Sequence, residues 1–321
     1  MKDFFTARLT RELYTGESHR SWRNPTAQGS HPFIPDAGPD QALLESLVLH
    51  RLMSFPSFHP HPLGVSHVRA LPQCRLAVHV DTPKSGANDD PLFTSTAHNL
   101  FPIRYADGEV YGVPGLRIFA VSGRALTIGL AGTNARITLF TRTGWRRWLA
   151  RWHDTVSATN ESTPLWYSGH LTSHERASIG THRKMMPWLG SGLLRRVGLF
   201  HLIGRAYVVR GWTADGKWKI EMNRHADIDV DHDIFLSLLT ESAFGLPLKE
   251  VSRWCNCGRG AGIPNGCWIE LVHKDNRITG GLQLRFCSER PDQTFIQELA
   301  DSGADINWLI QADPLKPARR G

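Results

Sequence analysis

The chain of 321 residues carries 37 Lys and Arg against 30 Asp and Glu, a formal charge of +7, and 41% of its residues are hydrophobic. This composition is that of an ordinary globular protein with one large or two ordinary domains, and its positive charge favours polyanionic partners. No apolar run approaches the roughly 18 to 20 residues of a membrane span, and residues 1–13 lack the order of a signal peptide, so we expect a cytoplasmic protein with no membrane partner.

The first quarter of the sequence predicts a strand, a helix and a second strand. Residues 4–13 (FFTARLTREL) alternate in polarity, as an opening strand would. Asp40 is placed to cap a helix over residues 41–53 (QALLESLVLHRLM), whose leucines form a continuous apolar face. Residues 74–80 have strand character, and residues 81–91 (DTPKSGANDDP) predict a mobile connection.

Three more strands and a basic helix complete the N-terminal half. The strand-like runs cover residues 115–121, 125–130 and 136–142. Residues 144–154 (GWRRWLARWHD) then predict a helix with Arg147 and Arg151 one turn apart. Its tryptophans share another stripe of that helix: Trp145, Trp148 and Trp152.

This order of elements permits a ferredoxin-like unit in the N-terminal half. In that order the chain is similar to ferredoxin-like RNA binders, among them the repeat-associated proteins that bind and process guide RNA in bacterial immunity. The resemblance implies an RNA-binding subunit of a ribonucleoprotein complex with a role in antiviral defence. It rests on element order, and no motif of these families is present in the sequence.

The second half predicts hairpins and short helices. Residues 165–171 read as a strand, and a hairpin turns at Asp215 and Gly216. A helix is expected over residues 234–244, a second hairpin over residues 267–286, and a last short helix over residues 291–303. The predicted fold class is therefore α+β with mostly antiparallel sheets and a few packed helices, divided into domains at 1–156 and 157–321.

Positive charge and tryptophan concentrate in one window of the chain. Residues 136–224 hold 15 Lys and Arg against 5 Asp and Glu, together with seven of the 11 Trp. Arginines neutralise phosphates and flat rings accept base faces, so this window predicts binding of nucleic acid, RNA or single strands in particular. The residues expected at such an interface are Trp145, Arg146, Arg147, Trp148, Arg151, Arg183, Lys184, Arg195 and Arg196.

Two other functions, protein docking and phosphodiester cleavage, remain open, and the tryptophan stripe also has a purely structural explanation. The tryptophan stripe would equally serve as the buried side of an amphipathic helix, and a Trp and Arg surface also suits docking on another protein subunit. Asp227, Asp229 and Asp231 alternate along the chain and could hold Mg²⁺ or Mn²⁺ for phosphodiester cleavage by a nuclease. Against this, aspartates are also common turn residues.

A zinc site is a further alternative. Cys255, Cys257 and Cys267 lie close together in the sequence, with His273 or Cys287 as a fourth ligand. A single residue separates the first two cysteines, which makes joint chelation awkward and favours plain reduced thiols, so no cofactor or metal ligand is assigned.

The sequence leaves enzymatic activity open. For metal-free RNA cleavage the first candidates within the basic window are His170, His174 and His182, with Tyr167 and Ser168 nearby. Phosphate-loop, serine-hydrolase, zinc-protease and dinucleotide motifs are absent from the sequence.

Overall fold

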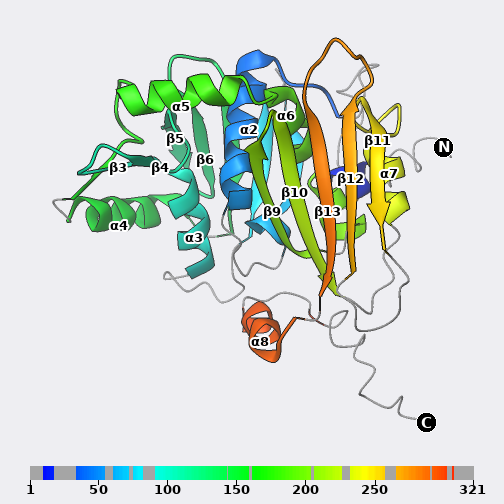
Figure 1. Cartoon of the computed structure of the whole chain (residues 1–321). Helices are drawn as coiled ribbons and strands as arrows, with labels where there is room; N and C mark the ends of the chain where they lie inside the picture. The colour runs from blue at the N-terminus through cyan, green and yellow to red at the C-terminus, as the bar shows by residue number, and fades with distance from the viewer. Residues whose placement is uncertain are drawn as a thin grey trace, which may run out of the picture.

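A computed structural model describes the chain as a set of ordered segments (Figure 1). The residues it describes are 10–17, 34–54, 61–71, 75–81, 91–142, 144–158, 161–203, 206–225, 232–256, 265–289, 291–301 and 306. Helices and mostly antiparallel sheets are mixed along the chain, which confirms the predicted α+β class.

The N-terminal sheet has five strands in the order β1-β2-β7-β6-β5. Their bounds are β1 Val65–Ala70, β2 Leu76–Val80, β5 Leu116–Ser122, β6 Ala125–Leu130 and β7 Arg136–Phe140. Only β2 and β7 run parallel. Alternation of apolar and polar residues puts Val78, Ile128 and Leu139 on one face, where each is at most 1% exposed, because that face covers the core.

The C-terminal sheet also has five strands, in the order β11-β12-β13-β10-β9. Their bounds are β9 Ala206–Ala214, β10 Lys217–His225, β11 Leu248–Cys255, β12 Asn265–His273 and β13 Gly281–Glu289. The parallel pair is β10 with β13. The expected turn at Asp215 and Gly216 joins β9 to β10, and both residues have positive φ angles of 55° and 68°, as a two-residue hairpin turn requires.

A small third sheet and several helices surround the two large sheets. The order β4-β3-β8 joins β3 Ile103–Tyr105, β4 Val110–Tyr111 and β8 Ser162–Pro164. The helices are α3 Pro91–Leu100, α4 Trp145–Ser157, α5 Ser173–Arg183, α6 Pro187–Leu194, α7 His232–Leu239 and α8 Gln293–Asp301, with short turns η3 Pro62–Gly64 and η5 Leu199–Ile203. Among the described helices, none has the length and apolar character that crossing a bilayer requires.

Helix α2, Pro39–Ser54, lies at the centre of the molecule, between the two large sheets (Figure 1). Eleven of its 16 residues are buried, which is the pattern of a helix covered on most of its sides. It packs against α6 and against strands of both sheets. The apolar core therefore continues across the expected boundary at residue 156, and the division into two domains stays a prediction.

Some sequence predictions are wrong in detail. Residues 10–15 are helical, although residues 4–13 were expected to open a sheet, and residues 1–9 lie outside the described part. Residues 165–171 form turns and not a strand. The N-terminal sheet has five strands and begins after a helix, so the strand and helix order of a ferredoxin-like unit is not the one observed.

Candidate nucleic-acid interface

The predicted basic helix forms, but its tryptophans belong to the core. Trp145 and Trp148 in α4 are 1% and 8% exposed, and both rings pack against Phe101. A fourth ring, Trp166, packs on the same phenylalanine and has no exposed surface. Burying large rings removes the most apolar area per residue, so the apolar stripe of the helix turns inward. Trp145 and Trp148 therefore cannot stack on bases, contrary to the sequence prediction.

The arginines of α4 face the solvent. Arg146, Arg147 and Arg151 are all exposed, and we call these three side chains the arginine face of α4. Beside Arg146 the surface is hollowed into a cavity of about 430 Å³, whose wall also includes His153, Asp154 and Tyr167. Partial burial raises the pKa of Tyr167, so its hydroxyl remains a hydrogen-bond donor at neutral pH. The guanidinium, imidazole and phenol around this hollow can hold a phosphate, whereas the carboxylate of Asp154 on the same wall repels one.

The other predicted arginines divide by burial. Arg195 is 2% exposed and pairs with Glu45 through two hydrogen bonds of 2.7 Å. Arg196 is 4% exposed and donates to the carbonyl oxygens of Gly192, Phe244 and Gly245. Both are structural, so assigning them to phosphates is wrong.

Arg183 and Lys184 remain accessible at the end of α5. Arg183 pairs with Asp40 at 3.1 Å, but both side chains are about half exposed, and such pairs are weak. A phosphate could therefore compete for Arg183.

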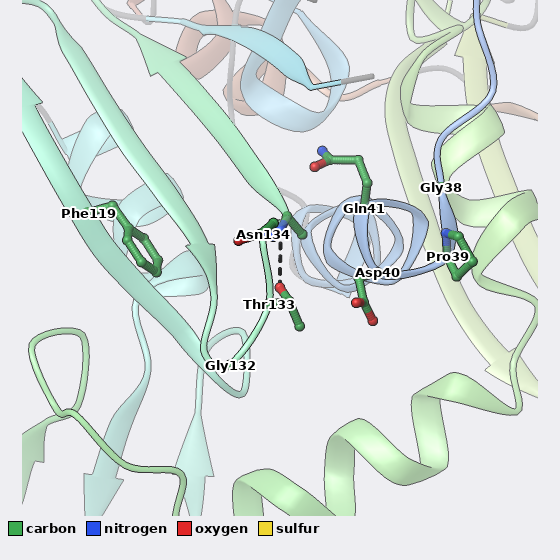
Figure 2. Close-up of a pocket in the computed structure, with 9 residues that line it drawn as sticks. Gly38, Pro39, Asp40, Gln41, Phe119, Gly132, Thr133 and Asn134 are labelled. Atoms are coloured by element: carbon green, nitrogen blue, oxygen red, sulfur yellow. Dashed lines mark hydrogen bonds between the residues drawn. The ribbon is translucent and has the colours of Figure 1, made fainter. Parts of the chain in front are cut away.

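A larger cavity of about 640 Å³ lies at the start of α2 (Figure 2). Figure 2 shows Phe119 of β5 on one side and Asp40 on the other, with the turn between β6 and β7 below. Phe119 is 47% exposed, and the guanidinium of Arg136 lies 3.4 Å from its ring centre. The cavity wall thus combines an exposed ring with a carboxylate, and the cation of Arg136 stacks on that ring. Each of the two cavities has one carboxylate, Asp40 here and Asp154 beside Arg146, but α4 also presents three exposed arginines, so the arginine face of α4 is the stronger candidate for binding an anion.

A second interface candidate was missed by the sequence analysis. The strand register places one row of side chains across the outer face of the C-terminal sheet: Trp254, Trp268, Arg285, Glu221 and Arg210. Trp212 of β9 and Lys219 of β10 are also paired with each other. Each lies two positions along its strand from the row, at Arg210 and Glu221, and therefore on the same face of the sheet. Strand spacing makes the row about 19 Å long.

The tryptophans of this row are open to solvent. Trp254, Trp268 and Trp212 are 59%, 48% and 44% exposed, and we call them, with Arg210, Lys219 and Arg285, the tryptophan face. In Figure 1 the sheet lies in the foreground with α2 and α6 behind it. The alternation in NGCWIEL, with Cys267, Ile269 and Leu271 inward, would have placed Trp268 outward. Arg210, Trp212 and Lys219 lie within the basic window of residues 136–224, whereas Trp254, Trp268 and Arg285 lie beyond its end.

The remaining sequence candidates have different outcomes. Asp227, Asp229 and Asp231 lie outside the described residues, so the nuclease hypothesis stays untested. His182 is buried, with a ring nitrogen 3.0 Å from the Ser46 hydroxyl, which removes it as a cleavage candidate. His170 and His174 are exposed.

The cysteine cluster has a different composition from the one expected. Cys255 and Cys267 lie close together, but His273 is at the other end of β12 with its ring against Trp188. The histidine that joins the two cysteines is His232. Cys257 lies outside the described residues.

No protein-family model, curated protein or solved structure matches this chain. The exposed side chains of α4 and of the C-terminal sheet are therefore the features that indicate a function.

Proposed function

We propose that this protein binds single-stranded nucleic acid, RNA in particular, with bases stacked on the tryptophan face. The observation that carries the proposal is that Trp254 and Trp268 lie side by side on an open sheet face, with Arg285 next to Trp268 and Lys219 next to the exposed Trp212 on the same face. Proteins that bind single strands stack successive bases on exposed rings and neutralise the backbone with Arg and Lys. A rigid five-stranded sheet holds the rings at fixed spacing, which lowers the entropic cost of binding.

The arginine face of α4 supports the same proposal as a second contact. Three exposed arginines on two turns of helix form a cationic strip with no sequence selectivity, suited to phosphates. Membership of a larger ribonucleoprotein, such as a guide-RNA complex, remains part of the proposal, although the observed order of elements differs from the ferredoxin-like order that suggested it.

The first test is binding of labelled single-stranded RNA, single-stranded DNA and duplex DNA at several salt concentrations, followed by fluorescence anisotropy. Trp254→Ala or Trp268→Ala should weaken single-strand binding by about 5- to 150-fold, the loss expected for one base stack. Tyr105→Ala is the matched control, because Tyr105 is 38% exposed but lies on β3, away from the sheet. Wild-type affinity in both tryptophan variants would refute the proposal for this face.

The arginine face is tested separately. Arg147→Ala combined with Arg151→Ala should lower affinity for all sequences alike and reduce the slope of log affinity against log salt by about 1.4, which is two phosphate contacts on a single strand. Arg176→Ala, an exposed arginine of α5, is the control. An unchanged slope in the double variant would remove α4 from the interface.

A second candidate function is docking on a protein. It is favoured by the ion pairs within the tryptophan face, where Arg285 contacts Glu221 at 3.0 Å and Lys219 contacts Asp215 at 2.8 Å. Internally neutralised cations attract phosphates less, and exposed tryptophans are common anchors of protein interfaces. Absence of nucleic-acid binding at physiological salt, with a protein partner lost on Trp254→Ala, would decide for docking.

A further inference from the structure

The inner side of the C-terminal sheet brings three metal-binding side chains together. Cys255 ends β11 and lies directly opposite Cys267 of β12, so the two side chains share one face of the sheet. That face is covered by α7, whose first residue is His232. Residues far apart in the sequence therefore meet where the end of a hairpin reaches the start of a helix.

The distances suit a single ion. One ligand atom from each of His232, Cys255 and Cys267 lies within 4.8 Å of the other two, and the two sulfur atoms are 3.2 Å apart. A disulfide would need about 2.05 Å, whereas two thiolates on one tetrahedral Zn²⁺ are about 3.8 Å apart. The distance between the two sulfur atoms must therefore increase by about half an ångström for both to bind one zinc ion. Small rotations of the two cysteine side chains can produce this change.

The surroundings fit a partly enclosed site. Cys267 is 1% exposed and His232 is 7% exposed, and the ring of Phe286 lies 5.8 Å from that of His232. Cys255 belongs to the edge strand and is exposed, which gives an ion a path to the site. Two thiolates and an imidazole select a soft or borderline ion over Mg²⁺.

We propose that His232, Cys255 and Cys267 bind Zn²⁺, and that water or a further ligand takes the fourth position, since the part of the chain that the structure describes supplies these three ligands. The ion would fasten α7 to the β11–β12 hairpin. Trp254 and Trp268 are the sequence neighbours of the two cysteines, so the same ion would fix the strand ends that carry the tryptophan face. The site does not depend on what that face binds.

The test uses the full chain, purified under reducing conditions, stripped with a chelator and titrated with Co²⁺. One equivalent should bind and give a thiolate-to-cobalt charge-transfer band together with the strong visible bands of tetrahedral cobalt, both abolished by excess Zn²⁺. Elemental analysis of protein expressed with zinc should give one ion per chain.

Two variants make the test specific. Cys255→Ser changes an exposed side chain, so the fold should persist, and metal affinity should fall at least about tenfold with weaker charge transfer. Cys287→Ser is the matched control, since Cys287 is a buried cysteine of the same sheet whose strand neighbours are Gly266 and Asn223. Failure of the reduced wild type to bind cobalt, or cobalt spectra unchanged by Cys255→Ser, would overturn the proposal.

Discussion

Glu45 and Arg195 join the helices α2 and α6 through a buried ion pair. Glu45 has no exposed surface and also accepts from Ser191 and Gln41. Removing one partner of such a pair leaves the other buried without compensation. Arg195→Met should therefore lower the free energy of unfolding by about 3 to 5 kcal/mol, measured by urea unfolding followed by tryptophan fluorescence.

The control for this prediction is an arginine on the surface. Arg183→Met removes the half-exposed pair with Asp40 and should cost less than about 1 kcal/mol. Equal losses in the two variants would show that burial does not govern the contribution of these arginines.

Burial also explains for which residues the sequence alone could predict a position in the core or on the surface. The periodicity of Trp145 and Trp148 defined a stripe correctly, but a stripe of rings is compatible with either a core or a ligand, and only the packing against Phe101 decides. Arg195 and Arg196 are adjacent to each other in a basic window, yet their partners, Glu45 and Phe244, are far away in the sequence. Long-range partners of this kind are not encoded in local charge.

At the scale of elements, α2 and α6 cross at a glycine. A Cβ on Gly190 would lie 2.4 Å from the Ser46 hydroxyl and 2.6 Å from the Trp218 ring, so the helices approach closely there because this side chain is absent. Gly190→Ala should destabilise the protein by about 1 to 3 kcal/mol through overpacking, which thermal and urea unfolding would measure.

Gly180 provides the comparison within the same fold. It lies in α5, and a Cβ there would meet nothing within 4 Å. Gly180→Ala should stabilise by up to about 1 kcal/mol, because alanine has the higher helix propensity. A Gly190→Ala protein as stable as Gly180→Ala would contradict the close crossing of α2 and α6.

Local signals placed elements well where they were strong. The apolar run of α2 and the Asp215 and Gly216 turn were predicted at the positions observed. Helix α5 was missed, although Thr172 and Glu175 form a capping box that the pattern T-x-x-E encodes. Strand β11 was also missed, because seven of its eight residues are at least partly open to solvent and give no period-two signal.

At the scale of the whole molecule, folding removes four histidines of the two halves of the chain partly or almost fully from water. Burial lowers the pKa of His50, His67 and His182 to about 4 and that of His79 to about 3, with a further contribution from neighbouring cations and imidazoles. In the unfolded chain each titrates near 6.5. The unfolded state therefore binds more protons than the folded state between about pH 6.5 and pH 4.

Stability should consequently be complete above pH 6.5 and fall as the pH drops toward 4, by about 1.4 kcal/mol per pH unit for each such histidine. Because native proteins are stable by only about 5 to 15 kcal/mol, we expect acid unfolding to occur within this interval. Urea unfolding at pH 7.5, 6.0 and 5.0 measures the slope, and His182→Gln, which keeps a partner for Ser46, should reduce it by one histidine's share. The exposed His174→Gln should leave the slope unchanged. An unfolding free energy that stays level from pH 7.5 to pH 5.0 would mean that water and protons reach these rings in the folded protein.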